Sequence, residues 1–493
     1  MLSSVTAMPR LSLTLRALLL VPLLAVGVDL ARATLACGPR AESCLEAAGR
    51  GWLGPAGVVL ILLYAAALSV GIARLARGMA ARPAGIGVDT WGVDFGLLDA
   101  SGELLGAPVH YRDRRTDGIM EQVCARLGKA NIFEQTGIQF MPINTLYQLA
   151  SLAARRAPQL TLASTFLTMP DLINYWLCGA RVCERTNAST TQLLNPRAGG
   201  WAYELMQPLE IPATIFPELV DPGTLLGRFE GVPVIAPACH DTASAVAACP
   251  ASTRDYAYIS SGTWSLVGLE LDQPIITAQA LEANVTNEAG VGGSYRLLKN
   301  VMGLWILQQC RATWQAQGYD YSYDQLVELA AQAPPLRSPI TPDDPRFLPA
   351  GDHPAHVRAL CAERALPIPE SHGAIVRSVL EGLALAYRQV LERLRTLSGR
   401  RVERIHMLGG GIHNQLLCQM TADATGLPVL AGPAEATVVG NALVQLIALG
   451  ELSGLAQARE LLARSVLLRQ YAPRQTQQWQ EAYDQFRVSS FEF

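Results

Sequence analysis

Two kinds of hydrophobic pattern follow one another along the chain, and the change falls near residue 83. Residues 11–31 and 51–73 are apolar almost throughout, and the second of these stretches contains no charged residue. A helix needs roughly 20 apolar residues to cross a bilayer. After residue 83, short apolar runs alternate with amphipathic stretches, which is typical of an α/β protein. The pattern predicts an α/β protein preceded by an α-helical membrane hairpin.

The polar residues around the two apolar stretches predict how the hairpin is oriented. Arginines flank the pair: Arg10 and Arg16 near its start, and Arg74, Arg77 and Arg82 after its end. Basic residues collect on the cytoplasmic side, so both ends are expected there, with Cys37 and Cys44 able to form a disulfide in the outward-facing loop. A signal peptide would explain the first stretch only, and two buried core helices would explain both.

The soluble part of the chain shows a regular succession of strand and helix signals. Strands are predicted at residues 86–88, 89–98, 232–236, 256–259, 404–408 and 427–430, the first two pairing as a hairpin. Helices are predicted at residues 146–155, 166–177 and 435–449, and a long one runs from a Ser371 cap to about residue 399. A chain of 493 residues is too long for one core, so we expect domains at residues 83–245 and 246–480 after the segment 1–82.

Composition and charge narrow the possible functions. Hydrophobic residues make up 50% of the chain and charged residues 16%, which is enough apolar material for a large core. The net charge is -3 and no long basic block occurs, which argues against a nucleic-acid partner. The 10 cysteines are scattered without a C-x-x-C pair, so zinc is disfavoured and most are expected to be reduced thiols in a cytoplasmic core.

Asp241 is the carboxylate that the pattern places best for chemistry. It follows the predicted strand 232–236, and Thr242 or Ser244 could begin a helix after it. The carboxyl ends of strands are where open α/β sheets bind ligands. A carboxylate there can accept a proton from an attacking hydroxyl. The alternative is an ordinary helix cap.

Two glycine-rich turns are candidates for holding phosphate. Residues 260–265 form a hydroxyl- and glycine-rich turn after the strand 256–259, and residues 409–411 are three glycines after the strand 404–408. Backbone N–H groups in such turns can cradle an anion. Both could equally be plain connections between elements. The charged residues 111–116 suit polyol hydroxyls or carboxylates, or form a solvated loop.

Taken in order from residue 86 to about residue 471, these motifs resemble the FGGY family of carbohydrate kinases. The matching stretches are residues 87–95, 111–113, 141–149, 239–245, 260–265, 300–305, 342–347, 409–411 and 435–437. The resemblance implies two actin-like (ribonuclease H-like) domains with a central cleft. It also implies transfer of the γ-phosphate of ATP to a sugar hydroxyl with Mg²⁺. The narrower match implies L-rhamnulose as the sugar and L-rhamnulose 1-phosphate as the product.

The same resemblance implies a role for individual residues. Asp241 matches the proton acceptor of the family. The sugar contacts it implies are Gly92, His240, Thr242 and Asn300, and the nucleotide contacts are Thr263, Gln308 and Gly410. Metal ligands are not assigned.

Residues 1–82 depart from the family. Its members begin with strands and an Asp-x-Gly hairpin that holds the ATP phosphates, and the nearest match here, residues 26–31, is taken as chance. The kinase domain is therefore expected to lack its first strands. Two alternatives stay open: a membrane-tethered sugar-binding protein without catalysis, and a kinase for another ketose such as fuculose or xylulose.

Overall fold

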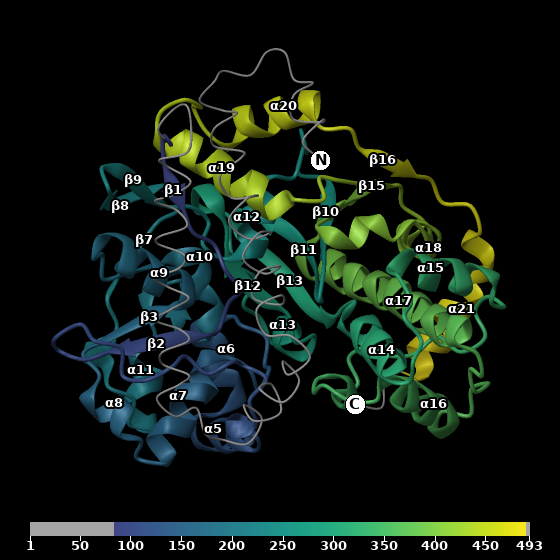
Figure 1. Ribbon diagram of the computed structural model, residues 1–493, viewed down its shortest axis with the longest axis horizontal. Helices are drawn as coiled ribbons and strands as arrows, with labels where there is room; N and C mark the ends of the chain where they lie inside the picture. Colours follow the sequence, from purple (N-terminus) through teal and green to yellow (C-terminus); the bar gives the residue numbers. More distant parts are fainter. Residues whose placement is uncertain (1–82, 490–493) are drawn as a thin grey trace. The chain divides into compact units, whose positions relative to one another are not determined.

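The structure, a computed structural model, describes residues 83–489 (Figure 1). They form two compact units. The first contains residues 83–136, 141–247 and 437–458, and the second contains residues 137–140, 248–436 and 459–489. The predicted membrane hairpin lies outside the described residues. Within residues 83–489, no helix combines the length and the apolar composition needed to cross a membrane.

The first unit is built from short strands and helices. Its strands are β1 (Ile86–Gly87), β2 (Phe95–Leu98), β3 (Thr165–Thr168), β4 (Val182–Glu184), β5 (Leu194–Asn195), β6 (Gly200–Trp201), β7 (Glu218–Val220), β8 (Thr224–Phe229) and β9 (Val232–Ala236). Its helices are α5 (Ile119–Leu127), α6 (Lys129–Thr136), α7 (Thr145–Ala154), α8 (Pro158–Leu162), α9 (Met169–Cys178), α10 (Arg185–Ala188), α11 (Tyr203–Met206), α12 (Asp241–Ala247) and α19 (Ala436–Ala448). α19 belongs to this unit although most of the second unit precedes it in the sequence, which a division of the chain by sequence alone does not show.

One three-stranded sheet positions the chemistry of the first unit. Its strand order is β1-β9-β8, with β1 parallel and β8 antiparallel to β9. Ile86, Val232 and Val234 are buried and pack with Leu177 of α9. Burying these branched apolar side chains is the main force that holds α9 against the sheet. Because β1 and β9 are parallel, the loops that follow them leave from the same edge.

The second unit is built around a larger sheet. Its strands are β10 (Tyr256–Ser261), β11 (Trp264–Leu271), β12 (Thr286–Ala289), β13 (Tyr295–Met302), β14 (Arg404–Leu408), β15 (Val429–Ala431) and β16 (Arg469–Tyr471). Its helices are α13 (Ala278–Glu282), α14 (Trp305–Ala316), α15 (Tyr323–Gln332), α16 (His353–Glu363), α17 (His372–Ser398), α18 (Gln415–Thr425) and α21 (Thr476–Ser489). The division between the units falls within α20 (Leu455–Ser465).

The seven strands of this sheet follow the order β12-β13-β11-β10-β14-β15-β16. β14 runs parallel to β10 and to β15, and the other neighbours are antiparallel. The long helix α17 packs against β11 and β13 and lies beside α15 and α18 (Figure 1). Its apolar face is buried along the helix, with Ile375, Val379, Leu383 and Leu394 among the buried side chains. The core of the second unit therefore lies between this helix and the sheet.

Several predicted elements are confirmed. The strand predicted at residues 232–236 is β9, and the one at 404–408 is β14. Ser371 caps α17 by accepting a hydrogen bond from the backbone N–H of Ala374, and the helix ends at Gly399 in the left-handed conformation. Glycine is favoured there because it has no Cβ to oppose a positive φ.

Two predicted elements are wrong in part. Residues 89–98 were expected to be one strand paired with residues 86–88, but only β2 is a strand, and it pairs with β3. The backbone of Val93 turns at φ +68° and bonds to side chains instead of a neighbouring strand. Residues 165–168, expected mostly in a helix, form β3. α9 starts only at Met169 because Pro170 fits the first turn of a helix but not its interior.

Candidate active site

Asp241 lies where the loops after β1 and β9 meet. Thr90 and His240 form a parallel bridge beyond the ends of the two strands. The backbone N–H of Asp241 donates to the carbonyl of Thr90 over 2.9 Å, and the N–H of Thr90 donates to the carbonyl of Cys239 over 3.0 Å. The backbone of Asp241 is therefore fixed by the neighbouring loop as well as by its own helix, α12.

The carboxylate of Asp241 has one engaged oxygen. Its Oδ1 accepts from the backbone N–H of Thr242 at 2.5 Å and from the Thr242 hydroxyl at 3.1 Å. His240 Nε2 lies 3.4 Å from the same oxygen. Within residues 83–489, no hydrogen bond to Oδ2 is found, and the side chain is 44% exposed. Oδ2 can therefore take up a proton from a bound hydroxyl.

The helix α19, which comes almost 200 residues later in the chain, also supports this site. The hydroxyl of Thr437 donates to the carbonyl of Asp241 at 3.2 Å. Asn441 Nδ2 donates to Asp89 Oδ2 at 2.5 Å and to the carbonyl of Gly87 at 3.2 Å. Burial raises the pKa of Asp89 to about 7, the hydrogen bond from Asn441 lowers it, and the nearby charge of Asp241 raises it further. Asp89, whose pKa lies near neutral, therefore interacts with the charge of Asp241.

Glu184 is a buried carboxylate that holds the Asp241 loop in place. It accepts from the N–H groups of Thr186 at 2.9 Å, Asn187 at 3.2 Å and Cys239 at 3.0 Å, and from the Thr186 hydroxyl at 2.6 Å. The same hydroxyl accepts from the backbone N–H of His240 at 3.1 Å. Buried charges are tolerated when such donors satisfy them. Glu184 is thus a positioning residue for the loop that carries Asp241.

A third carboxylate, Asp171, is buried beside Glu184. Its Oδ1 accepts from the backbone N–H of Glu184 at 3.2 Å, and Thr168 donates its hydroxyl to Oδ2. Burial raises the pKa of Asp171 to about 8, and the hydroxyl of Thr168 lowers it, while the charge of Glu184 raises it. Burial also raises the pKa of Glu184. Asp171 is expected to carry a proton at neutral pH.

Gly92 lies in a turn that leaves no room for a side chain. A Cβ there would come within 2.6 Å of the hydroxyl oxygen of Thr190. Next to it, Val93 has φ +68°, which is strained for a β-branched residue. Its N–H is held by Thr190 Oγ1 at 3.0 Å, and its carbonyl by Thr145 Oγ1 at 2.7 Å and Gln148 Nε2 at 3.2 Å. This side-chain support keeps the strained turn in one conformation.

In the second unit, the β10–β11 turn is bonded to the start of α14. The N–H of Leu304 donates to the carbonyl of Gly262 at 2.9 Å, and the N–H of Gly303 donates to the carbonyl of Thr263 at 3.1 Å. A Cβ on Gly303 would lie 2.8 Å from the oxygen of Gly262, so glycine is needed for this approach. These backbone hydrogen bonds join the turn that contains Thr263 to the helix that contains Gln308.

The three glycines after β14 lie at the same sheet edge as this turn. β10 and β14 are parallel, with Ser260 opposite Leu408. A Cβ on Gly411 would lie 2.1 Å from Ser261 Oγ, whereas a Cβ on Gly410 would meet no atom within 4 Å. Gly410 is exposed and the space beside its Cα is open, which suits a turn that binds phosphate through its N–H groups.

Asn300 lies near the end of β13 and is held by Gln139. Gln139 Oε1 accepts from the backbone N–H of Asn300 at 2.9 Å and from its side-chain amide at 3.2 Å. The next residues are supported by Asp343, which accepts from the N–H of Met302 at 3.0 Å. Burial raises the pKa of Asp343 and lowers the pKa of Lys299.

The structure places the eight predicted site residues in two groups, one in each unit. The group of the first unit is Gly92, His240, Asp241 and Thr242, and that of the second is Thr263, Asn300, Gln308 and Gly410. Sequence reasoning missed the supporting residues Glu184 and Asn441. A run of polar residues at the end of β4 could have indicated Glu184. Nothing in the sequence connects Asn441 with a strand more than 300 residues earlier.

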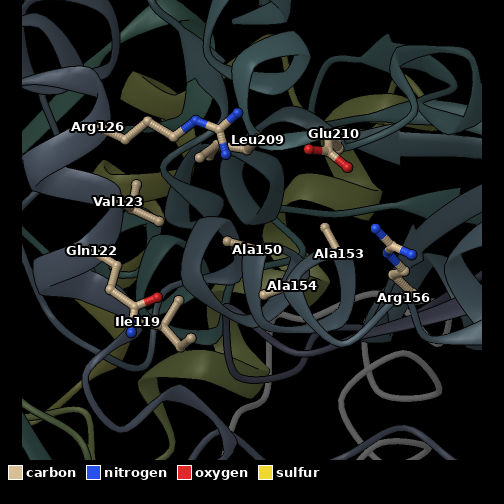
Figure 2. Close-up of a pocket in the computed structure, with 10 residues that line it drawn as sticks. All are labelled: Ile119, Gln122, Val123, Arg126, Ala150, Ala153, Ala154, Arg156, Leu209 and Glu210. Atoms are coloured by element: carbon tan, nitrogen blue, oxygen red, sulfur yellow. The ribbon is translucent and has the colours of Figure 1, made fainter.

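A pocket of about 310 Å³ lies elsewhere in the first unit, between α5, α7 and the turn after Leu209 (Figure 2). Ala150, Ala153 and Ala154 form part of its wall, and the charged side chains at its edge are Arg126, Arg156 and Glu210 (Figure 2). None of its lining residues is a predicted site residue. Among the residues that the structure describes, no group of three or more His, Cys, Asp or Glu side chains could hold a metal ion.

Both units of the chain match models of known protein families. The N-terminal domain of the FGGY family of carbohydrate kinases matches residues 71–246, and the C-terminal domain matches residues 257–449. The chain is 44% identical over 414 residues to a rhamnulokinase of Bacteroides thetaiotaomicron, covering 82% of this chain and 84% of that protein. It is 45% identical over 398 residues to a rhamnulokinase of Pectobacterium carotovorum, covering 80% and 79%.

Solved structures show the same fold. A ligand-bound xylulose kinase from Lactobacillus acidophilus superimposes with a TM-score of 0.72 at 18% identity, covering 87% of this chain and 88% of that one. A glycerol kinase from Plasmodium falciparum with ADP superimposes with a TM-score of 0.67 at 15% identity, covering 86% and 87%. The chain has the two-domain α/β fold of these sugar kinases.

Proposed function

Because the chain belongs to the FGGY family of carbohydrate kinases, we propose that it transfers the γ-phosphate of ATP to L-rhamnulose, giving L-rhamnulose 1-phosphate and ADP. The observation that carries this proposal is the Asp241 carboxylate, fixed at the carboxyl end of β9 with Oδ2 left open. The relatives that carry the name rhamnulokinase support the choice of sugar.

In the proposed reaction, Asp241 Oδ2 accepts the proton of the 1-hydroxyl as that oxygen attacks the γ-phosphorus. The bond between the γ-phosphorus and the bridging oxygen to the β-phosphate breaks, and ADP leaves with the bond electrons. Phosphoryl transfer depends mainly on positioning and on neutralising charge. The supports around Asp241 are suited to this, because Thr90 and Thr437 bond its backbone and Glu184 bonds the backbone of Cys239 in the same loop.

The other assignments extend the family pattern to this chain. We assign Gly92, His240, Thr242 and Asn300 to the sugar, and Thr263, Gln308 and Gly410 to the nucleotide. The surroundings of Gly410 support its assignment, because the residue is exposed and a Cβ there would meet no atom within 4 Å. The proposed domain limits along the sequence are residues 83–245 and 246–480, and residues 437–458 of the second stretch pack with the first unit.

Mg²⁺ is the usual metal of such kinases. In phosphoryl-transfer sites it is commonly bound by one or two carboxylates together with the phosphates of the substrate. No residue is assigned to it.

Two proposals concern location. The eight cysteines of the described residues are free thiols, six of them buried, which supports a reducing, cytoplasmic compartment for the kinase domains. Membrane contact through residues 11–31 and 51–73 is supported by the apolar sequence only. Fractionation of cells that produce the full chain or residues 83–493 tests it, since only the full chain should sediment with membranes.

The experiment that tests the function is ATP-dependent ADP release by the purified full chain. L-rhamnulose, L-fuculose and D-xylulose are supplied separately, and the product is identified by phosphorus NMR. Selective turnover of L-rhamnulose with phosphate at the 1-position is expected. Preference for fuculose or xylulose would replace the proposed sugar. Sugar binding without turnover would favour the non-catalytic alternative.

A further inference from the structure

Trp91 is a large aromatic side chain that stays exposed at the candidate active site. It immediately precedes Gly92, and 43% of its surface is exposed. Single exposed hydrophobic residues are common and carry no meaning by themselves. Trp91 is different because its indole does not move freely: its Nε1–H donates to Asp94 Oδ2 over 2.8 Å.

The partner of the indole is a carboxylate that is itself buried. Asp94 is 2% exposed and accepts from the backbone N–H of Tyr111 at 3.3 Å and from Gln148 Nε2 at 3.4 Å. Burial raises the pKa of Asp94 to about 6, while the hydrogen bond from Trp91 lowers it. Removing a carboxylate from water is unfavourable unless donors satisfy it. The bond to Asp94 therefore fixes the indole, although removing this carboxylate from water is unfavourable.

The backbone of Trp91 is tied to the loop that carries Asp241. The carbonyl of Trp91 accepts from Asn187 Nδ2 at 3.2 Å, and the same amide group donates to the carbonyl of Cys239 at 3.3 Å. On the other side, Val93 is held in its strained turn. An exposed aromatic ring is thus held in one orientation, on a backbone that is tied to the loop carrying the proposed proton acceptor.

We propose that the Trp91 indole contacts the C6 methyl group of the ketose and selects 6-deoxy sugars. This inference rests on the proposed function. L-rhamnulose is 6-deoxy-L-fructose, so its C6 is a methyl group where L-fructose has a hydroxymethyl group. An aromatic face gains from contact with an apolar methyl group. The hydroxyl of L-fructose would lose water there without gaining a hydrogen bond of equal strength.

The test compares kcat/KM for L-rhamnulose and L-fructose, which differ at C6 alone. The unaltered chain should prefer L-rhamnulose by about 10-fold or more, the usual range for such a difference in a pocket. Trp91→Ala should reduce this ratio toward one, mainly by lowering kcat/KM for L-rhamnulose. Trp91→Phe keeps an apolar ring and should keep most of the preference. Tyr203→Ala, at an aromatic residue with 49% exposure on α11, should leave the ratio unchanged.

The outcomes separate this inference from the proposed function. If the unaltered chain phosphorylates no ketose, the proposed function fails, and calorimetric affinities for the two sugars test the methyl contact instead. If turnover is normal and a folded Trp91→Ala variant keeps the full preference for L-rhamnulose, the indole does not select the methyl group. Should the alanine variant not fold, Trp91→Gln, which removes the apolar ring but fills part of its space, replaces it, and a full preference for L-rhamnulose in that variant would equally overturn the inference.

Discussion

The N–H of Asp241 donates a hydrogen bond to the carbonyl of Thr90 over 2.9 Å. The residue proposed to accept the proton is therefore fixed by the loop that contains Thr90, which lies 151 positions earlier in the chain. A carboxylate held by its backbone in this way can be altered at the side chain without loosening the loop. The site can consequently be tested by conservative substitution.

Asp241→Asn should abolish phosphorylation and leave sugar binding nearly unchanged. The amide keeps the size of the side chain but cannot accept a proton from the sugar, and a general base typically contributes about 10²- to 10⁴-fold to the rate. Turnover is measured by ADP release and binding by calorimetry with L-rhamnulose. Asp117→Asn, on an exposed loop, is the control and should retain activity. Comparable turnover in both variants would remove Asp241 from its proposed role.

Glu184→Ala should destabilise the first unit. The N–H groups of Cys239, Thr186 and Asn187 would lose their buried acceptor, and leaving such groups unsatisfied typically costs about 1–3 kcal/mol each. Urea unfolding should show a lower free energy of unfolding, and kcat should fall with it because the Asp241 loop loosens. Glu204→Ala is the matched control at an exposed glutamate of α11. Equal stability of the two variants would contradict the positioning role of Glu184.

Asp171→Asn should flatten the dependence of stability on pH. Burial raises the pKa of Asp171 from 3.8 to about 8, so the folded protein binds this proton more tightly than the unfolded chain. The stability that this group contributes is complete below about pH 4 and is lost as the pH rises to about 8. Asparagine cannot ionise and avoids this loss. Urea unfolding at about pH 5 and about pH 8 should therefore show a smaller drop for the variant, and an identical drop would show that Asp171 does not titrate in this range.

Gly411→Ala and Gly410→Ala should behave differently although they are neighbours. The new Cβ at 411 would lie 2.1 Å from Ser261 Oγ, whereas the one at 410 would meet no atom within 4 Å. Overpacking of this kind typically costs about 1–3 kcal/mol. Thermal unfolding should therefore show a clear loss for Gly411→Ala only. Similar melting temperatures would mean that the turn can move away from Ser261.

The sequence pattern allowed much of this fold to be predicted, where local signals were strong. The long helix α17 is an example, because its apolar spacing, its Ser371 cap and its Gly399 end all agree. The turn at Val93 cannot be predicted from its own stretch of sequence, because the alternation of residues 89–98 fits a strand and the bonds of Val93 to Thr145 and Thr190 are long-range. The part that Glu184 plays at the site does not follow from its local bonds to Thr186 and Asn187, because its link to the Asp241 loop is the bond from Cys239, 55 positions away.

The late position of α19 in the sequence affects when the site can be completed during synthesis. A chain is made from its amino terminus, and its parts begin to fold as they emerge. Thr437 and Asn441 are therefore made after the whole span from β10 to β15, yet they complete the surroundings of Asp241 and Asp89. A nascent chain that has not reached this helix already carries every proposed sugar and nucleotide contact. It still lacks the Thr437 hydroxyl that donates to the carbonyl of Asp241 and the Asn441 amide that donates to Asp89, so the surroundings of the proposed proton acceptor are completed late in synthesis.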